Sequence, residues 1–151
     1  MTEKLKELPI IRPMRRSDYQ RIAEIDKKIT GRDRLEYWKF RAELAEKEFS
    51  VVALVAEVEG TIVGFIIGDV SGWEYMVPQS VGWINTIVVT PEYQRMGIGQ
   101  MLFNEMVEHM KKAGVKSIYA FIYWRDFDLL RFFDSIGFKK GDMVNLRLDI
   151  A

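Results

Sequence analysis

A strand-to-helix turn decides the fold of this chain, and it reads Ile87-Val88-Val89-Thr90-Pro91-Glu92-Tyr93-Gln94-Arg95-Met96-Gly97-Ile98-Gly99. The apolar run Ile87-Val88-Val89 ends at position 89, and apolar residues then recur at every fourth position from 98 to 110. This pattern predicts a buried strand over residues 81–89, followed by an amphipathic helix over residues 97–113. Pro91 cannot extend the strand, and Gly97 and Gly99 tolerate a positive φ that lets a ligand approach the backbone.

The start of that helix is a candidate anion site. Its first N–H groups have no partner within the helix and lie at the positive end of the helix dipole, which favours a phosphate. An ordinary tight turn packed against a neighbour is the alternative. A dinucleotide-binding fingerprint would need a third small residue where Leu102 or Phe103 stands, and a P-loop would need Gly-Lys-Ser/Thr. Both common phosphate-binding motifs are therefore disfavoured.

Hydrophobic periodicity elsewhere predicts the element order β-α-α-β-β-β-α-β-α-β. Ser17 and Asp18 offer an N-cap for the first helix, and Glu59-Gly60 is typical of a hairpin turn. An antiparallel hairpin run combined with a strand-helix-strand crossover predicts an α/β protein of the α+β mixed-sheet kind, with six to seven strands and about four helices. The remaining predicted strands cover residues 10–14, 49–58, 61–70, 116–123 and 138–150, and the remaining helices cover residues 17–29, 33–47 and 126–136.

Composition restricts the class of protein. The 151 residues, 48% of them hydrophobic, suit a single domain over residues 1–151, and no apolar run approaches the length of a membrane span. The 22 basic and 22 acidic side chains cancel, which argues against nucleic acid as a partner. Without cysteine there is no disulfide, thiolate metal site or cysteine nucleophile, and we predict no metal. The first eight residues lack the apolar core of a targeting signal, so we expect a cytoplasmic protein.

Two blocks of sequence resemble the GNAT superfamily of acyl-coenzyme A-dependent N-acyltransferases. Gln94, Gly97 and Gly99 match its signature of arginine or glutamine, two variable residues, glycine, one residue, and glycine or alanine. The second block is Phe133-Asp134-Ser135-Ile136-Gly137-Phe138, which is similar to the family's aromatic residue followed by Gly-Phe. The resemblance covers residues 50–140 and implies a GNAT-like fold with acetyl-coenzyme A as acyl donor.

The resemblance also implies where this cosubstrate binds. The strand backbone at Ile87, Val88 and Val89 would pair with the pantetheine arm as another strand would, and an N–H at Val88 would polarise the thioester carbonyl. Asp126 stands where relatives often have an asparagine that contacts the arm, although capping the following helix explains it equally well. The pyrophosphate would lie against the turn residues Gln94, Arg95, Met96, Gly97, Ile98, Gly99 and Gln100.

The positions that move protons in many relatives are substituted here. Phe133, which we also place at the cosubstrate, stands where a tyrosine protonates the leaving thiolate, and the usual general-base glutamates would fall near Trp83, Asn85 or Phe121. A base must then be Glu74, or a water relay through Asn85 and Thr86; alternatively Glu74 is only a solvated loop carboxylate. Tyr123 is the remaining phenol as a candidate to reach the sulfur, although tyrosine at a strand end more often serves packing.

The resulting prediction is an N-acetyltransferase. It would transfer an acetyl group to a primary amine of a peptide, a protein N-terminus or a small molecule by direct attack in a ternary complex. The alternative is a catalytically silent acyl-coenzyme A sensor or protein-interaction module, which the substituted positions keep open. The acceptor would bind near residues 31–40 and 72–77, no membrane is expected as partner, and a homodimer is left open.

Overall fold

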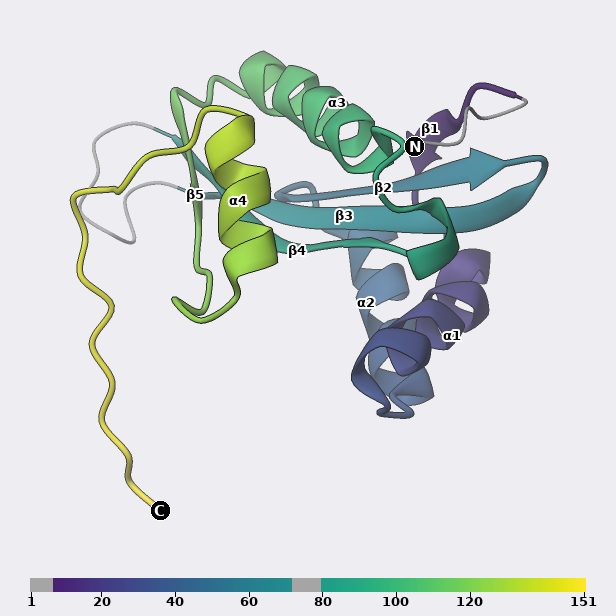
Figure 1. Ribbon diagram of the computed structural model, residues 1–151, viewed down its shortest axis with the longest axis horizontal. Coiled ribbons are helices and arrows are strands. Elements are labelled where there is room, and N and C mark those ends of the chain that lie inside the picture. The colour runs from purple at the N-terminus through teal and green to yellow at the C-terminus, as the bar shows by residue number, and fades with distance from the viewer. Residues whose placement is uncertain (1–6, 72–79) are drawn as a thin grey trace. The chain divides into compact units, whose positions relative to one another are not determined.

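A five-stranded mixed sheet forms the centre of the first of two structural units, Met1–Ala120 and Phe121–Ala151 (Figure 1). The computed structural model describes residues 7–71 and 80–151 of the chain. The strands of the sheet follow one another in chain order. Neighbouring strands are antiparallel, except for the last pair, which is parallel. They are β1 (Ile10–Pro13), β2 (Val51–Val58), β3 (Thr61–Ser71), β4 (Val81–Val89) and β5 (Ser117–Ala120).

Helices cover both faces of this sheet (Figure 1). Helices α1 (Tyr19–Thr30) and α2 (Leu35–Lys47) share one face, where Phe65 and Ile67 of β3 belong to the same buried cluster as Ile25 and Trp38. Helix α3 (Ile98–Lys112) lies on the other face and approaches the strands closely. A Cβ atom added to Gly82 would collide with Sδ of Met110. The flexible end of the Met110 side chain therefore fills the space beside Gly82, where the crossover helix meets β4.

Most of the predicted elements are confirmed. The helix expected over residues 97–113 is Ile98–Lys112, and the strand expected over residues 81–89 is Val81–Val89. The predicted hairpin turn has the two consecutive positive φ angles of its type, 51° at Glu59 and 80° at Gly60. Gly31 ends α1 with a φ of 74°, as its place after the last periodic residue indicates.

Two parts of the predicted sheet are wrong. The strand expected over residues 116–123 stops at Ala120, and residues 138–150 form no strand in the described part of the chain. The sheet thus has five strands instead of six to seven. Alternation of apolar and polar residues identifies the two faces of an extended segment, but a strand also needs a ladder partner, which local sequence does not specify.

Asp18 also differs from its predicted role. Its carboxylate does not cap α1; it accepts hydrogen bonds from the Arg12 guanidinium at 2.8 and 2.9 Å and from the Arg15 N–H at 2.6 Å. Arg12 reaches Glu57 on β2 as well, at 2.9 Å. A bidentate guanidinium pair is a stronger partner for a carboxylate than one backbone N–H, so the ion pair takes precedence.

The second unit contains α4 (Phe127–Ser135), which Asp126 caps by accepting a hydrogen bond from the Leu129 N–H at 3.1 Å. Phe133 is buried and meets the rings of Phe132 and Phe138 edge to face, with centroids 5.5 and 4.8 Å away. Among the residues described in the two units, no helix combines the length and the apolar character that a membrane crossing requires.

A buried carboxylate connects helices α1 and α2, which lie on the same face of the sheet. Asp26 of α1 is 5% exposed and accepts hydrogen bonds from Arg34 at 2.6 and 2.9 Å and from the indole N–H of Trp38 at 2.9 Å. Burial by itself raises the pKa of Asp26, but the bonds from Arg34 and Trp38 outweigh it and hold the pKa below its usual value of 3.8. Asp26 therefore stabilises the connection between α1 and α2 in its ionised form.

We predict that Asp26→Ala lowers the free energy of unfolding by about 2–4 kcal/mol, because it leaves the buried indole N–H and the guanidinium without their acceptor. Asp33→Ala is the matched control in the same connection. Asp33 is 70% exposed by side chain and lies 4.0 Å from Lys27, so its loss should change stability by less than about 0.5 kcal/mol. Urea unfolding measured at pH 7 tests both variants.

The pKa of Asp26 is lowered in the folded state, so its contribution is complete above the unfolded value of 3.8 and is lost as pH falls through the folded value. The stability difference between wild type and Asp26→Ala should therefore shrink as the pH is lowered from 6 toward 3. A difference that stays constant over this range would contradict a role for the ionised carboxylate.

Candidate functional site

The two edges of β4 are paired unequally. Along β3 the pairing runs the full length of the strand, from Val81 to Val89. Along β5 it covers only residues 81–84, which lie opposite residues 117–120. In the described parts of the chain, the edge of β4 from Asn85 onward has no partner strand on that side. An open edge of this kind exposes backbone donors and acceptors to an extended ligand.

The register decides which backbone groups face the open edge. The Thr90 N–H donates to the Val63 carbonyl at 2.8 Å, and Val88 lies opposite Phe65 in the same register. Because antiparallel pairs alternate, Val88 directs its N–H toward β3, whereas Ile87 and Val89 direct theirs to the open side. The N–H expected at Val88 is therefore committed within the sheet, and Ile87 takes its place as the outward donor. Which residues of β4 direct their N–H groups to the open side depends on strand pairing and cannot be predicted from the sequence.

The glycine turn follows directly from this edge. A short 3-10 segment, Pro91–Tyr93, leads into the turn, in which Arg95 and Gly97 have φ angles of 64° and 83°. Gln94 closes the turn by donating from its side-chain amide to the Val89 carbonyl at 2.8 Å. Gln94 thus shapes the turn through its side chain, a function that the motif alone does not reveal.

The helix start offers free donors to an anion. The first bond of α3 runs from the Met101 N–H to the Gly97 carbonyl at 3.0 Å, so the helix provides no acceptor for the N–H groups of Ile98, Gly99 and Gln100. No side chain caps this end of the helix. A Cβ atom added to Gly97 would meet nothing within 4 Å, so the turn is open on that side. This geometry fits a phosphate group.

A polar chain fastens the turn to α1. Thr90 is 1% exposed and donates to Glu92 at 2.8 Å, and Glu92 accepts from Lys28 of α1 at 2.6 Å. The hydrogen bond from Lys28 lowers the pKa of Glu92 to about 2. The turn is therefore held at the end of β4 by residues that no phosphate would need to contact.

Asn85, a predicted catalytic residue, occupies a β-bulge. The register shifts so that Ile67 lies opposite Thr86 while Gly68 lies opposite Ile84, which leaves Asn85 as the extra residue on β4. Its amide donates to the carboxylate of Asp69 on β3 at 2.5 Å. Sequence reasoning missed Asp69, although one acidic residue in an otherwise apolar strand was a signal that could have found it.

The other predicted site residues are distributed over the chain. Glu74, and the acceptor segment 72–77 that contains it, lie outside the described residues. Asp126, Phe133 and Tyr123 belong to the second unit, where Tyr123 is 80% exposed. Helix capping, one of the two roles considered for Asp126, is confirmed. Contacts of these residues with the cosubstrate stay predictions.

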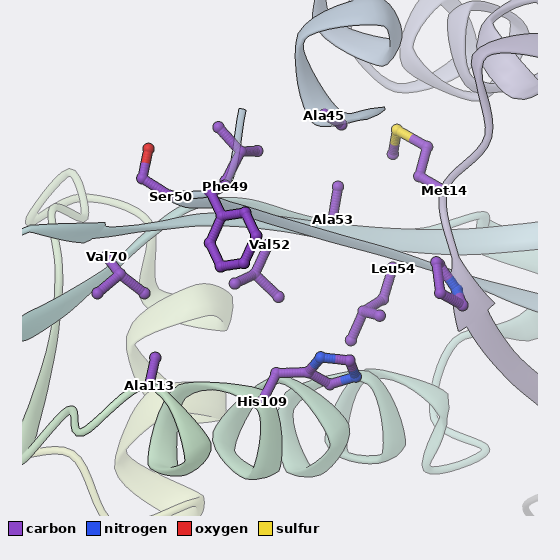
Figure 2. Close-up of a pocket in the computed structure, with 12 residues that line it drawn as sticks. Met14, Ala45, Phe49, Ser50, Val52, Ala53, Leu54, Val70, His109 and Ala113 are labelled. Carbon is purple, nitrogen blue, oxygen red and sulfur yellow. The ribbon is translucent and has the colours of Figure 1, made fainter. Parts of the chain in front are cut away.

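A hollow of about 520 Å³ lies elsewhere on the first unit (Figure 2). Val52, Leu54 and Val70 point from the sheet toward His109 of α3, while Met14, Ala45 and Ala53 lie on the opposite side of the strands (Figure 2). His109 is roughly 16 Å along the helix from its first residue, at a rise of 1.5 Å per residue. This apolar hollow is thus separate from the glycine turn.

Comparison with known proteins agrees with the geometry. The family model described as acetyltransferase (GNAT) family matches residues 12–138. An N-alpha-acetyltransferase of Sulfurisphaera tokodaii is 27% identical over 86% of this chain and 80% of its own length. An uncharacterised N-acetyltransferase of Methanocaldococcus jannaschii is 29% identical over 60% of this chain. The match spans 40% of that archaeal protein and 32% of a mycothiol acetyltransferase of Thermomonospora curvata, well under half of each.

Solved structures share the fold. The aminoglycoside N-acetyltransferase AAC(6')-Iy, in complex with a coenzyme A bisubstrate analogue, superposes with a TM-score of 0.83 at 13% identity, covering 96% of this chain and all of that one. A ribosomal-protein-alanine N-acetyltransferase of Brucella melitensis gives a TM-score of 0.77 at 16% identity over 95% of this chain. The sheet, the open edge and the turn define an acyltransferase-like α/β protein. The chain belongs to the acetyltransferase (GNAT) family.

We predict that Gly97→Ala weakens coenzyme A binding about tenfold or more, a loss typical of one charged hydrogen bond. The left-handed φ of 83° becomes strained for alanine, which shifts the N–H groups of the turn. Gly114→Ala is the matched control, because Gly114 has the same φ of 83° and equally open surroundings at the other end of α3. Both variants should lose about 1–2 kcal/mol of stability.

Isothermal calorimetry with coenzyme A and thermal unfolding separate the two effects. Equal losses of affinity in Gly97→Ala and Gly114→Ala would show that the turn has no special part in binding the ligand.

Proposed function

We propose that this protein is an N-acetyltransferase that transfers the acetyl group of acetyl-coenzyme A to a primary amine by direct attack in a ternary complex. The observation that carries the proposal is the continuity of two features. The open edge of β4, with outward backbone groups at Ile87 and Val89, runs directly into a turn with free N–H groups at the start of α3. A pantetheine arm with a terminal pyrophosphate matches both features along one line.

Different backbone groups would bind the cosubstrate and polarise its thioester. The Ile87 carbonyl and the Val89 N–H pair with the amides of the arm, and the N–H groups at residues 98–100 hold the pyrophosphate. The outward N–H of Ile87 donates to the thioester oxygen, where negative charge develops as the amine attacks. A fixed backbone dipole needs no reorganisation at that moment, and its removal typically costs 10²- to 10³-fold in rate.

The acceptor is a peptide or protein amino terminus, or a small molecule that carries a primary amine. Both kinds occur among the similar proteins: one is named for N-alpha-acetylation, and another is an aminoglycoside N-acetyltransferase. On the α1–α2 side, Arg34 is occupied by Asp26 and stacks over Tyr37 at 5.2 Å, whereas Tyr37 and Phe40 remain exposed. The exposed aromatic residues, rather than Arg34, are thus the part of this region that is available to an acceptor.

We predict that acetyl-coenzyme A at 100 times its dissociation constant stabilises the protein by about 2.7 kcal/mol, equivalent to a rise in melting temperature of roughly 5–10 °C. ATP and NAD at the same concentration should give no comparable shift, because neither has an arm to pair with the β4 edge. Differential scanning fluorimetry measures all three ligands. The absence of a shift with acetyl-coenzyme A and other acyl-coenzyme A esters would refute the proposed function.

Catalysis needs a second measurement. Release of free thiol from acetyl-coenzyme A is followed with peptides that have free amino termini, with polyamines and with amino-sugars. Turnover with any of these amines supports the transferase. Binding of acetyl-coenzyme A without thiol release on any acceptor would instead indicate a silent acyl-coenzyme A sensor.

A further inference from the structure

Asp69 lies on the same face of the sheet as helices α1 and α2. Side chains alternate along β3, and Phe65 and Ile67 both belong to the buried cluster that these helices cover. Asp69 is the next residue in that series, beyond the part of the strand where the cluster forms. Asp69 is partly exposed, so its carboxylate is accessible to solvent although it lies on the same side of β3 as the buried Phe65 and Ile67.

The bulge on β4 turns Asn85 toward this carboxylate. The extra residue breaks the alternation of β4, so Asn85 and Thr86 follow each other at the point where pairing with β5 ends. Nδ2 of Asn85 then donates to Oδ2 of Asp69. Bulges re-aim side chains and are found next to active sites more often than elsewhere in sheets. Through Asn85, the bulge therefore connects the Asp69 carboxylate with the residue at which the open edge of β4 begins.

In the ladder, Asp69 lies three residues from Ile66, the partner of Ile87, which corresponds to about 10 Å along the strand. Asn85 precedes Ile87 by two residues, which corresponds to about 7 Å along a strand. Ile87 carries the outward N–H that faces the ligand side of β4. Because it is bonded to Asn85, the Asp69 carboxylate is directed along the sheet toward Ile87, and we place the acceptor amine between the two.

The neighbouring side chains are fixed by their own contacts. Trp83 lies opposite Asp69 in the register, donates from its indole N–H to Ser71 Oγ at 2.8 Å and stacks on Tyr119 with ring centroids 5.1 Å apart. Within residues 7–71 and 80–151, no hydrogen bond is made to Oδ1 of Asp69. An acceptor-only carboxylate with aromatic neighbours is suited to bind an amino group.

The geometry points to Asp69 as the residue that binds the acceptor amine and takes its proton, with Asn85 as the residue that positions the carboxylate; this inference rests on the proposed N-acetyltransferase function. The neutral amine nitrogen attacks the thioester carbonyl carbon, the carbonyl π pair moves to oxygen and returns when the C–S bond breaks, and the new C–N bond places positive charge on nitrogen. Asp69 removes a proton from that nitrogen. The C–S bond breaks with its electron pair on sulfur, and the thiolate receives the proton through solvent.

This assignment answers the question that the substituted family positions leave open. Neither Trp83, Asn85 nor Phe121 can act as a base, but Asn85 holds a carboxylate from the neighbouring strand at the same place in the sheet. In this protein the acidic group lies on β3, bonded to Asn85 of β4 across the ladder. A proton-transfer group of this kind contributes about 10²- to 10⁴-fold to the rate.

Asp69→Asn tests the assignment, because it preserves size and can still contact Asn85. With the amine that wild type acetylates fastest, kcat should fall about 10²- to 10⁴-fold while the dissociation constant for acetyl-coenzyme A stays unchanged. Glu108→Gln is the control: this glutamate is 61% exposed on α3, on the other face of the sheet, and its replacement should leave kcat at the wild-type value.

Asp69→Ala adds a readout that a purely structural role would not change. Formate can enter the space left by the side chain, so added formate should raise the turnover of Asp69→Ala severalfold and leave Glu108→Gln unaffected. Asn85→Ala should lower kcat less than Asp69→Asn does, because the carboxylate remains but loses its orientation.

The outcomes separate this inference from the proposed function. Wild-type kcat in Asp69→Asn overturns the assignment, and so does a loss in Asp69→Ala that formate leaves untouched. Neither result contradicts the proposed N-acetyltransferase function, because the wild-type protein still acetylates the amine. A wild type that releases no thiol with any amine of the panel overturns the proposed function and the assignment together.

Discussion

The unequal pairing of β4 is the constraint on which the rest of the site depends. One edge of this strand is satisfied by β3 from end to end, whereas the other edge is satisfied by β5 over only four residue pairs. Backbone donors and acceptors cannot be left buried without partners, so the open part of the edge must face solvent or a ligand. The bulge at Asn85 lies at the transition, and the glycine turn lies where the strand ends. An edge for an extended arm and a cradle for an anion are thus consecutive in the chain.

The remainder of the first unit holds β4 in this position. On one face, glycines allow α3 to pack closely against the strands, which brings the free N–H groups at its start next to the turn. On the other face, Asp26 joins α1 to α2, and Lys28 of α1 reaches Glu92 beyond the end of β4. These polar contacts lie away from the open edge. They orient the elements that form the site and leave the edge itself available.

The open edge of β4 and the sheet face that α1 and α2 cover would serve two different tasks. In the proposed binding mode the cosubstrate contacts backbone groups of β4 and of the α3 start, where glycine provides the turn. The proposed proton transfer uses a titratable group, and the bulge at Asn85 brings one from the adjacent strand, Asp69, next to β4. A search for a catalytic base should therefore include the residues of the neighbouring strand as well as the position itself, because cross-strand neighbours lie about 5 Å apart.

The sequence by itself determined the elements and the turn, because hydrophobic periodicity, proline and glycine act through local geometry. It identified Gln94, Gly97 and Gly99 as one motif and the hairpin turn at Glu59 and Gly60, and it offered helix capping as one of two roles for Asp126. Only the tertiary structure decided which N–H groups of β4 face outward, that β5 ends at Ala120, that residues 138–150 have no strand partner among the described residues, and that Asn85 meets Asp69. Each of these depends on pairing between segments distant in the chain, and a shift of one residue in register reverses the direction of every backbone group. That dependence on register is why the turn could be predicted and the partner of Asn85 could not.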